Sequence, residues 1–335
     1  MNRKNVLFID GLPDDQTAKI LRVGEDGSLT TATPGSSNIY TNLNTDSFNR
    51  YYLLLDANRQ QKINVGNIHA VFNQISDTDN HSITLSKMKN IYRQLHPEVE
   101  FFNPPHCVER TTRDNIFKLL QDIEKVQVPK TVRFTPRSPR DVYDKMAQER
   151  FGAPVILRPA GQHGGIGATL IREQRDESLF YPLALDGRDY YLTQYIDYGR
   201  QGIYHKTRLI VVEGEAYIRH ALFNDSWMVH ASSRSFMARN SHYLKKEQKI
   251  LESFDQEYKP RLQKQIGQIY ERIGLDYFGI DCHIDEKFNM LIFELNASMN
   301  ALVKPAGIPN EPHLNRKTDE INRVIVGMIE KRLNR

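Results

Sequence analysis

Two acidic side chains near the C-terminal end of the chain have a spacing that suits metal binding. The segment Phe278 to Ala297 contains two apolar, β-prone runs on either side of the polar stretch Asp285 to Asn289. This pattern predicts a hairpin. If the last four residues of the polar stretch form the loop, Asp281 pairs with Glu294, and the two-residue period of a strand puts Asn296 on the same face.

Two carboxylates in this arrangement lie roughly 5 Å apart and repel each other by about 3 kcal/mol at an effective dielectric of about 20. A bound cation reverses the sign of this interaction. Mg²⁺ prefers carboxylate and amide oxygens and often shares its coordination with nucleotide phosphates. Asp281, Glu294 and Asn296 are therefore the predicted ligands of Mg²⁺, with Mn²⁺ as an alternative ion, whereas zinc would need more His or Cys ligands. The alternative is that these residues lie on a solvent-exposed face of an antiparallel sheet and have no function.

A glycine-rich turn lies in the middle of the chain, between the apolar runs Val155 to Leu157 and Ala168 to Ile171. Glycines let backbone N–H groups approach phosphate oxygens closely. No Gly-Lys-Ser/Thr sequence follows, so the turn is not a Walker A loop, and the next segment reads as a strand rather than the helix of a dinucleotide site. The segment is predicted to be a hairpin flap, and the alternative is an ordinary turn.

The composition is that of a globular protein with more than one domain. The chain has 335 residues, of which 39% are hydrophobic and 26% charged, and its net charge of +4 argues weakly for anionic ligands and against a nucleic-acid partner. It has two cysteines, no apolar run of membrane-spanning length, and an N-terminal apolar run too short for a signal peptide. We expect a cytoplasmic protein that binds neither membrane nor nucleic acid.

The first hundred residues are predicted to form an open α/β domain. Val6 to Ile9 and Tyr51 to Leu55 predict buried strands of a parallel sheet, and Ile68 to Ile75 predicts a further strand. Helices are expected from Ser86 to Leu95 and from about Thr112 to Ile123.

The second half of the chain is predicted to alternate strands and helices. A strand pair turns at Glu213 to Glu215, and a helical stripe from Leu262 to Ile273 ends at Gly274. Lys206 and Arg208 are two residues apart on one predicted strand and so share a face. They could meet a phosphoryl group, and the alternative is a strand face with solvated cations.

The order of these segments resembles the ATP-grasp superfamily. The similarity covers roughly Asn103 to Ala301 and is carried by PVILRPAGQHGG, HKTRLIVVEG, DSWMVHA, GLDYFGIDCHI and FELNAS, which resemble in particular the ATP-grasp proteins often joined to tetratricopeptide repeats. The resemblance implies an α/β and α+β fold in which two lobes clasp a nucleotide. The implied domains are an N-terminal α/β domain (1–110), a lobe with the flap (111–195) and a lobe with the metal-binding hairpin (196–335).

The resemblance also implies roles for individual residues. ATP would be contacted by Arg113, Arg158, His163, Gly164, Gly165, Gly167 and the hinge Gln194, Tyr195 and Ile196. Lys206 and Arg208 would be the catalytic cations, and the substrate would meet His220, Trp227, His230 and Arg234. Arg113 and Arg158 stand where many such enzymes have lysine. Arg binds phosphate as a planar fork rather than as a point charge.

The function implied by the resemblance is that of an ATP-dependent carboxylate–amine ligase, which forms an amide or peptide bond through an acyl phosphate and releases ADP and phosphate. Its partners would be small-molecule or peptide carboxylates and amines, and a homodimer is among the open oligomeric states. The alternatives are an ATP-grasp kinase of small molecules, which forms no amide, and a non-catalytic nucleotide-binding module.

Overall fold

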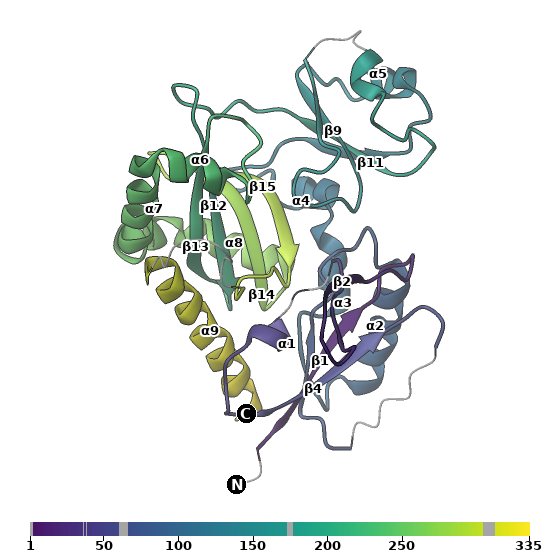
Figure 1. The fold of residues 1–335 in the computed structure, drawn as a ribbon, viewed down its shortest axis with the longest axis vertical. Helices are drawn as coiled ribbons and strands as arrows, with labels where there is room; N and C mark the ends of the chain where they lie inside the picture. The colour runs from purple at the N-terminus through teal and green to yellow at the C-terminus, as the bar shows by residue number, and fades with distance from the viewer. Residues whose placement is uncertain (1–2, 36, 38, 60–65, 173–176, 304–311) are drawn as a thin grey trace.

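The structure is a computed structural model that describes residues 3–35, 37, 39–59, 66–172, 177–303 and 312–335. Its N-terminal part, at the lower right of Figure 1, is a four-stranded parallel sheet with the order β4-β1-β5-β6. The strands and the helices that accompany them are β1 (Asn5–Gly11), β4 (Asn49–Leu55), β5 (Ala70–Asn73), β6 (Glu100–Phe102), α1 (Ile39–Asn42), α2 (Ser82–Leu95) and α3 (Pro105–Val108). This confirms the predicted open α/β architecture of the N-terminal part, and its bounds as a domain stay a prediction.

Two predictions for this sheet need correction. The strand β4 was expected to be buried, but it lies at the edge of the sheet, where Tyr51 and Tyr52 are 49% and 43% exposed. An edge strand has one strand neighbour, so its apolar side chains are less covered than those of a central strand. The strand predicted from Ile68 to Ile75 is confined to Ala70–Asn73.

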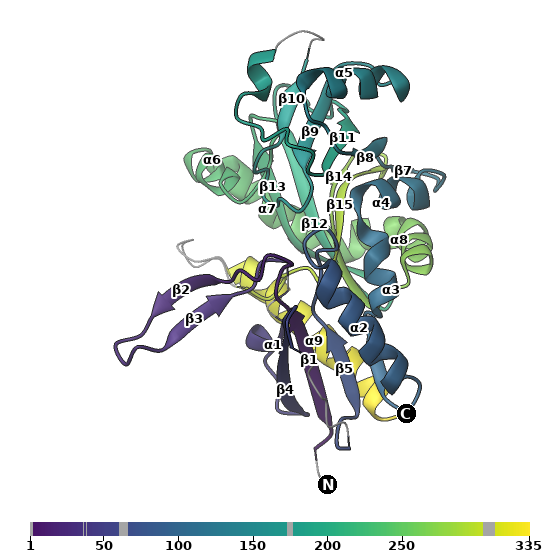
Figure 2. The same ribbon diagram turned by 90° about the vertical axis from the view of Figure 1, so that its right-hand side faces the viewer.

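The sequence analysis did not predict the hairpin of β2 (Lys19–Val23) and β3 (Leu29–Ala32). Every residue of β2 is exposed, and the hairpin projects from the body of the protein (Figure 2). Without a buried face, the strand has no period-two pattern by which the sequence could have revealed it.

The central part is an antiparallel sheet with the order β10-β9-β11-β8. Its elements are β8 (Thr131–Phe134), α5 (Pro139–Gln148), β9 (Val155–Pro159), β10 (Thr169–Ile171) and β11 (Tyr190–Gln194). A capping box between Ser138 and Asp141 starts α5. The glycine-rich flap, residues 160–168, joins β9 to β10, which confirms the predicted hairpin.

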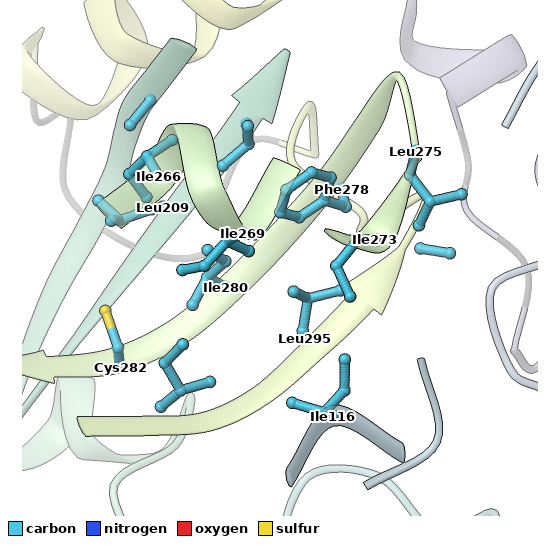
Figure 3. Packing of buried hydrophobic residues seen from close by; sticks show 14 of the residues in the cluster. Ile116, Leu209, Ile266, Ile269, Ile273, Leu275, Phe278, Ile280, Cys282 and Leu295 are labelled. Atoms are coloured by element: carbon cyan, nitrogen blue, oxygen red, sulfur yellow. The ribbon is translucent and has the colours of Figure 1, made fainter. Parts of the chain in front are cut away.

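The third part is a five-stranded sheet with the order β13-β12-β14-β15-β7. Its strands are β7 (Val126–Gln127), β12 (Tyr204–Val212), β13 (Glu215–Asn224), β14 (Tyr277–Ile284) and β15 (Met290–Ala297). The helix α8 (Lys259–Ile273) packs its apolar stripe on one face of this sheet (Figure 3). As predicted, the helix ends at Gly274, which has the left-handed conformation with φ 72°.

The side chains buried between α8 and this sheet show which strand residues project from the opposite face of the sheet. Ile266 and Ile269 of α8 lie in one buried cluster with Leu209, Ile280 and Leu295 of the sheet (Figure 3). Because side chains alternate along a strand, the residues next to these strand positions project from the opposite face. That face carries the predicted cations and carboxylates.

The remaining helices pack mainly on the five-stranded sheet. They are α4 (Arg113–Leu120), α6 (Ser233–Arg239), α7 (Ser241–Ser253) and α9 (Pro312–Leu333), together with 3₁₀ turns at Glu109–Thr111 and Glu177–Phe180 and a π-helical turn at Phe254–Tyr258. Residues of α9 share a buried cluster with both the N-terminal and the five-stranded sheets. The strand β7 is the edge strand of the five-stranded sheet, and α4 packs on β15 of the same sheet, although both precede the flap in sequence. Across the described ranges, no helix combines the length and apolarity needed to span a membrane.

Candidate active site

A cavity of about 320 Å³ lies between the central sheet and the five-stranded sheet. Strands β9 and β11 and the flap form one side, strands β12 to β15 form the other, and the start of α4 and the loop 227–231 complete the edge. Most of the predicted site residues line it, namely Arg113, Arg158, Gly164, Gly165, Gln194, Tyr195, Ile196, Lys206, Arg208, His220, Trp227, His230, Asp281 and Glu294.

The hairpin of β14 and β15 has the predicted pairing at its centre, where Asp281 lies opposite Glu294. Its loop differs from the prediction, because five residues, 285–289, separate the strands instead of four. A bulge restores the pairing by leaving Phe293 as an extra residue in β15. The consecutive residues Phe293 and Glu294 therefore both line the cavity.

Asp281 is the centre of a buried ion-pair cluster. Lys206 Nζ donates to Oδ2 at 2.9 Å, and Arg208 donates from Nε to Oδ1 at 2.7 Å and from Nη2 to Oδ2 at 2.9 Å. The Asp281 side chain is only 2% exposed. Burial alone would raise its pKa, but the charges of Arg208 and Lys206 outweigh burial and hold the pKa below its usual range.

Glu294 has a different set of partners. Arg113 at the start of α4 forms an ion pair with Oε2, and Asn296 Nδ2 donates to Oε1 at 2.9 Å. Burial raises the pKa of Glu294, but the nearby cations, Arg113 first among them, outweigh burial and hold the pKa below its usual range. The repulsion between the two carboxylates is thus offset by cations of the protein itself.

Of the four Lys and Arg side chains that line the described cavity, Arg158 is the one without an ion-pair partner. Its Nη2 donates to the Gln162 carbonyl at 2.5 Å, and its buried Nε has no hydrogen-bond partner in the part of the chain that the structure describes. Burial and the nearby charge of Arg113 lower its pKa to about 9, so it stays protonated at neutral pH. Four Lys or Arg side chains and two carboxylates line the described cavity, which leaves two surplus positive charges. This end of the cavity favours an anion.

The other end of the cavity is lined by apolar and aromatic side chains. Ile156 and Leu291 contribute to its walls, and Tyr195 contacts Trp227 edge to face with ring centres 6.0 Å apart. The amide of Gln194 donates to the carbonyls of residues 152 and 154 at 2.8 and 3.0 Å. A planar apolar group fits this environment.

Tyr198, Met228 and Phe293 also line the cavity, and the sequence analysis did not single them out. Tyr198 lies just after the predicted hinge, and its hydroxyl donates to the Trp227 carbonyl at 3.2 Å. Its place two residues after Ile196 was the available signal. Phe293 offered none, because a regular strand would have pointed it away from the cavity.

Four predicted site residues lie outside this cavity. His163 and Asn296 line a neighbouring pocket of about 30 Å³, which shares Arg113 and Glu294 with the cavity. Gly167 lies in the flap, where an added Cβ would approach Pro159. The Arg234 guanidinium is held by Glu247, a fully buried carboxylate of α7, with Nη2 to Oε1 at 2.7 Å.

The two histidines predicted to contact the substrate both line the cavity. His220 lies on β13 opposite Arg208, and burial lowers its pKa well below the usual range. It is therefore neutral at physiological pH. His230 belongs to the loop before α6, and its ring contacts Ser232.

The donor atoms near the two carboxylates suit magnesium better than zinc. Asp281, Glu294 and Asn296 offer oxygen atoms, which Mg²⁺ prefers. In the part of the chain that the structure describes, no group of three or more His, Cys, Asp or Glu side chains could hold a metal ion. A metal ion here would therefore need further ligands from phosphate and water, as Mg²⁺ bound with a nucleotide has.

No protein-family model and no curated protein matches the sequence. Solved structures match nearly the whole chain. VanG D-Ala:D-Ser ligase from Enterococcus faecalis has 11% identity and a TM-score of 0.54, with 98% of this chain and 99% of that chain covered. D-alanyl-alanine synthetase A from Vibrio cholerae has 12% identity and a TM-score of 0.54, with 100% of both covered. D-alanine–D-alanine ligase from Bacillus anthracis complexed with ATP has 11% identity and a TM-score of 0.51, with 99% and 97% covered.

This chain has the ATP-grasp fold. Its mixed α/β architecture confirms the predicted fold class. In the ATP-grasp fold of this chain, the flap and hinge form one wall of the cavity and the hairpin with Asp281 and Glu294 forms the other. At these identities the likeness concerns the fold alone.

Proposed function

We propose that the chain is an ATP-dependent carboxylate–amine ligase. The observation that carries this proposal is the surplus of positive charge beside Asp281 and Glu294, in a cavity that has an apolar end and a glycine-rich flap. An apolar slot suits a nucleotide base, and buried cations suit its phosphates. The ATP-grasp fold supports the same assignment.

The phosphates would be oriented by two guanidinium groups. Arg158 has a buried Nε without a partner among the described residues, and its Nη2 is directed by the Gln162 carbonyl. Arg113 is oriented by Glu294 and by the Phe293 carbonyl at 2.9 Å. Fixed donors of this kind stabilise charge without reorganising during the reaction.

The metal ligands in this proposal are Asp281, Glu294 and Asn296. A bound Mg²⁺ neutralises charge on the phosphates and so favours phosphoryl transfer. Lys206 and Arg208 hold Asp281 in one orientation and add positive charge on the same strand face. They are the proposed catalytic cations for the phosphoryl group.

The proposed reaction has two steps. A substrate carboxylate oxygen attacks the γ-phosphorus of ATP, which breaks the bond to the β-phosphate oxygen and releases ADP. The amine nitrogen then attacks the acyl carbon, phosphate leaves, and the nitrogen loses a proton as the amide forms. Water must be kept from the acyl phosphate, and the flap with Tyr195 and Trp227 forms walls that can exclude it.

The proposed substrates are small-molecule or peptide carboxylates and amines. His220, Trp227 and His230 line the cavity and are proposed substrate contacts, together with Arg234, whose guanidinium is held by Glu247 outside the cavity lining. We also propose a cytoplasmic location, which is supported by two cysteines that are both buried and free. The homodimer stays a prediction.

The test is ADP release from Mg-ATP in the presence of pooled carboxylates and amines. Glu294→Gln should abolish the release, whereas Glu286→Gln, at a position 80% exposed in the hairpin loop, should retain it. Mass spectrometry should detect a product with a new C–N bond. A phosphorylated product without that bond would identify a kinase instead, and pool-dependent release that survives in Glu294→Gln would contradict the assigned site.

A further inference from the structure

The loop between β5 and α2, residues 76–80, reaches from the N-terminal sheet to the central sheet; we call it the latch loop. The Asp79 carboxylate accepts hydrogen bonds from Tyr191 Oη at 2.7 Å, from Arg133 Nη1 at 2.8 Å and from the Gly161 amide at 3.2 Å. These donors belong to β11, β8 and the flap. A single carboxylate of the N-terminal domain therefore joins three segments of the neighbouring lobe.

Two neighbours of Asp79 extend the contact along the flap. Asn80 Nδ2 donates to the Gly161 carbonyl at 2.8 Å and to Asp77 Oδ2 at 2.8 Å. The same Asp77 oxygen lies 3.0 Å from His163 Nε2. Both polar groups of the Gly161 backbone and the His163 side chain are thus held by the latch loop.

The contact depends on a glycine at position 161. Gly161 has φ +73°, a conformation that side chains disfavour, and an added Cβ would lie 2.3 Å from the side-chain atoms of Asn80. Only glycine lets the flap backbone approach Asn80 this closely. This steric need is independent of any need for close approach to phosphate.

The latch loop is itself held by the N-terminal domain. Ser76 Oγ donates to the Gly35 carbonyl at 2.8 Å, and Thr78 Oγ1 donates to the Val108 carbonyl at 3.2 Å. The amide of Asp14 donates to the Asn80 carbonyl at 2.7 Å. Because the latch loop is fixed at several points, it can hold the flap in one position instead of moving with it.

The latch loop contacts flap residues 161–163, which lie in the sequence between two residues that line the cavity. Residues 161–163 connect Arg158 on one side with Gly164 on the other, and Arg158 Nη2 donates to the Gln162 carbonyl at 2.5 Å. We propose that the latch loop positions the flap and Arg158 over the cavity, with Asp79 as its main positioning residue. Its effect on nucleotide binding rests on the proposed function, whereas its effect on the flap backbone does not.

Hydrogen exchange measured by mass spectrometry tests the backbone effect. The flap amides with defined acceptors are those of Ala160, Gly161, Ile166 and Ala168, and only that of Gly161 donates to the latch loop. Asp79→Asn should speed exchange within residues 160–168 by about 10- to 100-fold, because it weakens charge-assisted hydrogen bonds. Tyr191→Phe removes one hydroxyl donor and should act in the same direction even if the first variant folds poorly.

The matched control is Asp186→Asn. Asp186 lies in the same lobe, is 52% exposed and pairs with Arg188 two residues away. Its exchange pattern at the flap should equal that of the unmodified protein. The proposal is overturned if Asp79→Asn and Tyr191→Phe leave flap exchange at the control level. It is also overturned if exchange rises equally through β8, β9 and β11, because Asp79 would then stabilise the whole lobe.

The nucleotide arm uses Trp227, the single tryptophan, which lines the cavity. Mg-ATP titrations followed by its fluorescence should give about tenfold weaker binding in Asp79→Asn than in the Asp186→Asn control. Equal affinities would contradict the positioning of Arg158 by the latch loop. If the unmodified protein shows no ATP binding, even by calorimetry, the proposed function fails, and the exchange data still decide the latch loop.

Discussion

Replacing Arg208 by methionine should destabilise the protein strongly, because it leaves a buried carboxylate with too few partners. Asp281 is 2% exposed and accepts three hydrogen bonds from two cations. Arg208 supplies two of the three and is itself 24% exposed. Removing one partner of a buried ion pair costs about 3 to 5 kcal/mol. Since Lys206 remains, we expect a loss of about 3 kcal/mol, the lower end of that range.

The assay is urea unfolding followed by the fluorescence of Trp227, which lies in the same cavity as Arg208. The matched control is Arg200→Met. Arg200 pairs with Glu286 at the surface, where the two side chains are 65% and 80% exposed, so its loss should leave the unfolding midpoint unchanged. The comparison separates the loss of a buried pair from the general effect of replacing arginine by methionine.

A double variant tests the cause. In the Arg208→Met background, Asp281→Asn removes the charge that lacks its partner, so the second change should cost about 1 to 3 kcal/mol less than it does alone. The reasoning is refuted if the two changes are additive. It is equally refuted if Arg208→Met unfolds at the same urea concentration as Arg200→Met.

Three further predictions concern other parts of the molecule. The hydrogen bond to Asp77 raises the pKa of His163 above 6.5. The protonated His163 should therefore stabilise the fold fully below pH 6.5, and this contribution should be lost as the pH rises through the raised pKa. Thermal melts from about pH 5.5 to 8.5 should show the loss, and Asp77→Asn should abolish this pH dependence. Gly161→Ala should lower the melting temperature more than Gly164→Ala, because both have positive φ but only the first adds a Cβ that meets a neighbouring side chain; equal melting temperatures would contradict the steric argument. Ile280→Ala should cost about 2 to 5 kcal/mol in urea unfolding because Ile280 is fully buried under the site, and a cost below 1 kcal/mol would show that the core there repacks.

Strands with a buried face were predictable from the sequence. The run Val6 to Ile9 lies within β1 at the centre of its sheet, and both of its faces are covered. The exposed strand β2 escaped prediction, because without burial nothing selects apolar residues at alternate positions. The sequence predicts a buried strand at Tyr51 to Leu55, because apolar residues at a sheet edge look like those of a core.

The pairing of Asp281 with Glu294 was predictable, and the position of Phe293 was not. The pairing followed from alternation along two strands and the length of the polar stretch between them. The loop is one residue longer than predicted, and the bulge compensates for it, so the pairing at the site is unchanged. A bulge depends on how the strand fits its neighbours and leaves no local signal in one sequence.

The sequence by itself determined which residue types could reach the site: the carboxylates of the hairpin, the cations of β12 and the glycines of the flap all follow from local spacing. Only the tertiary structure decided their partners. Glu294 is paired with Arg113, 181 residues away in sequence, and Arg234 is held by Glu247. The contact of Asp79 with the flap likewise joins segments 82 residues apart in sequence. The periodicity of a sequence constrains only residues within one helix or strand, whereas these pairings depend on how separate sheets and helices pack together.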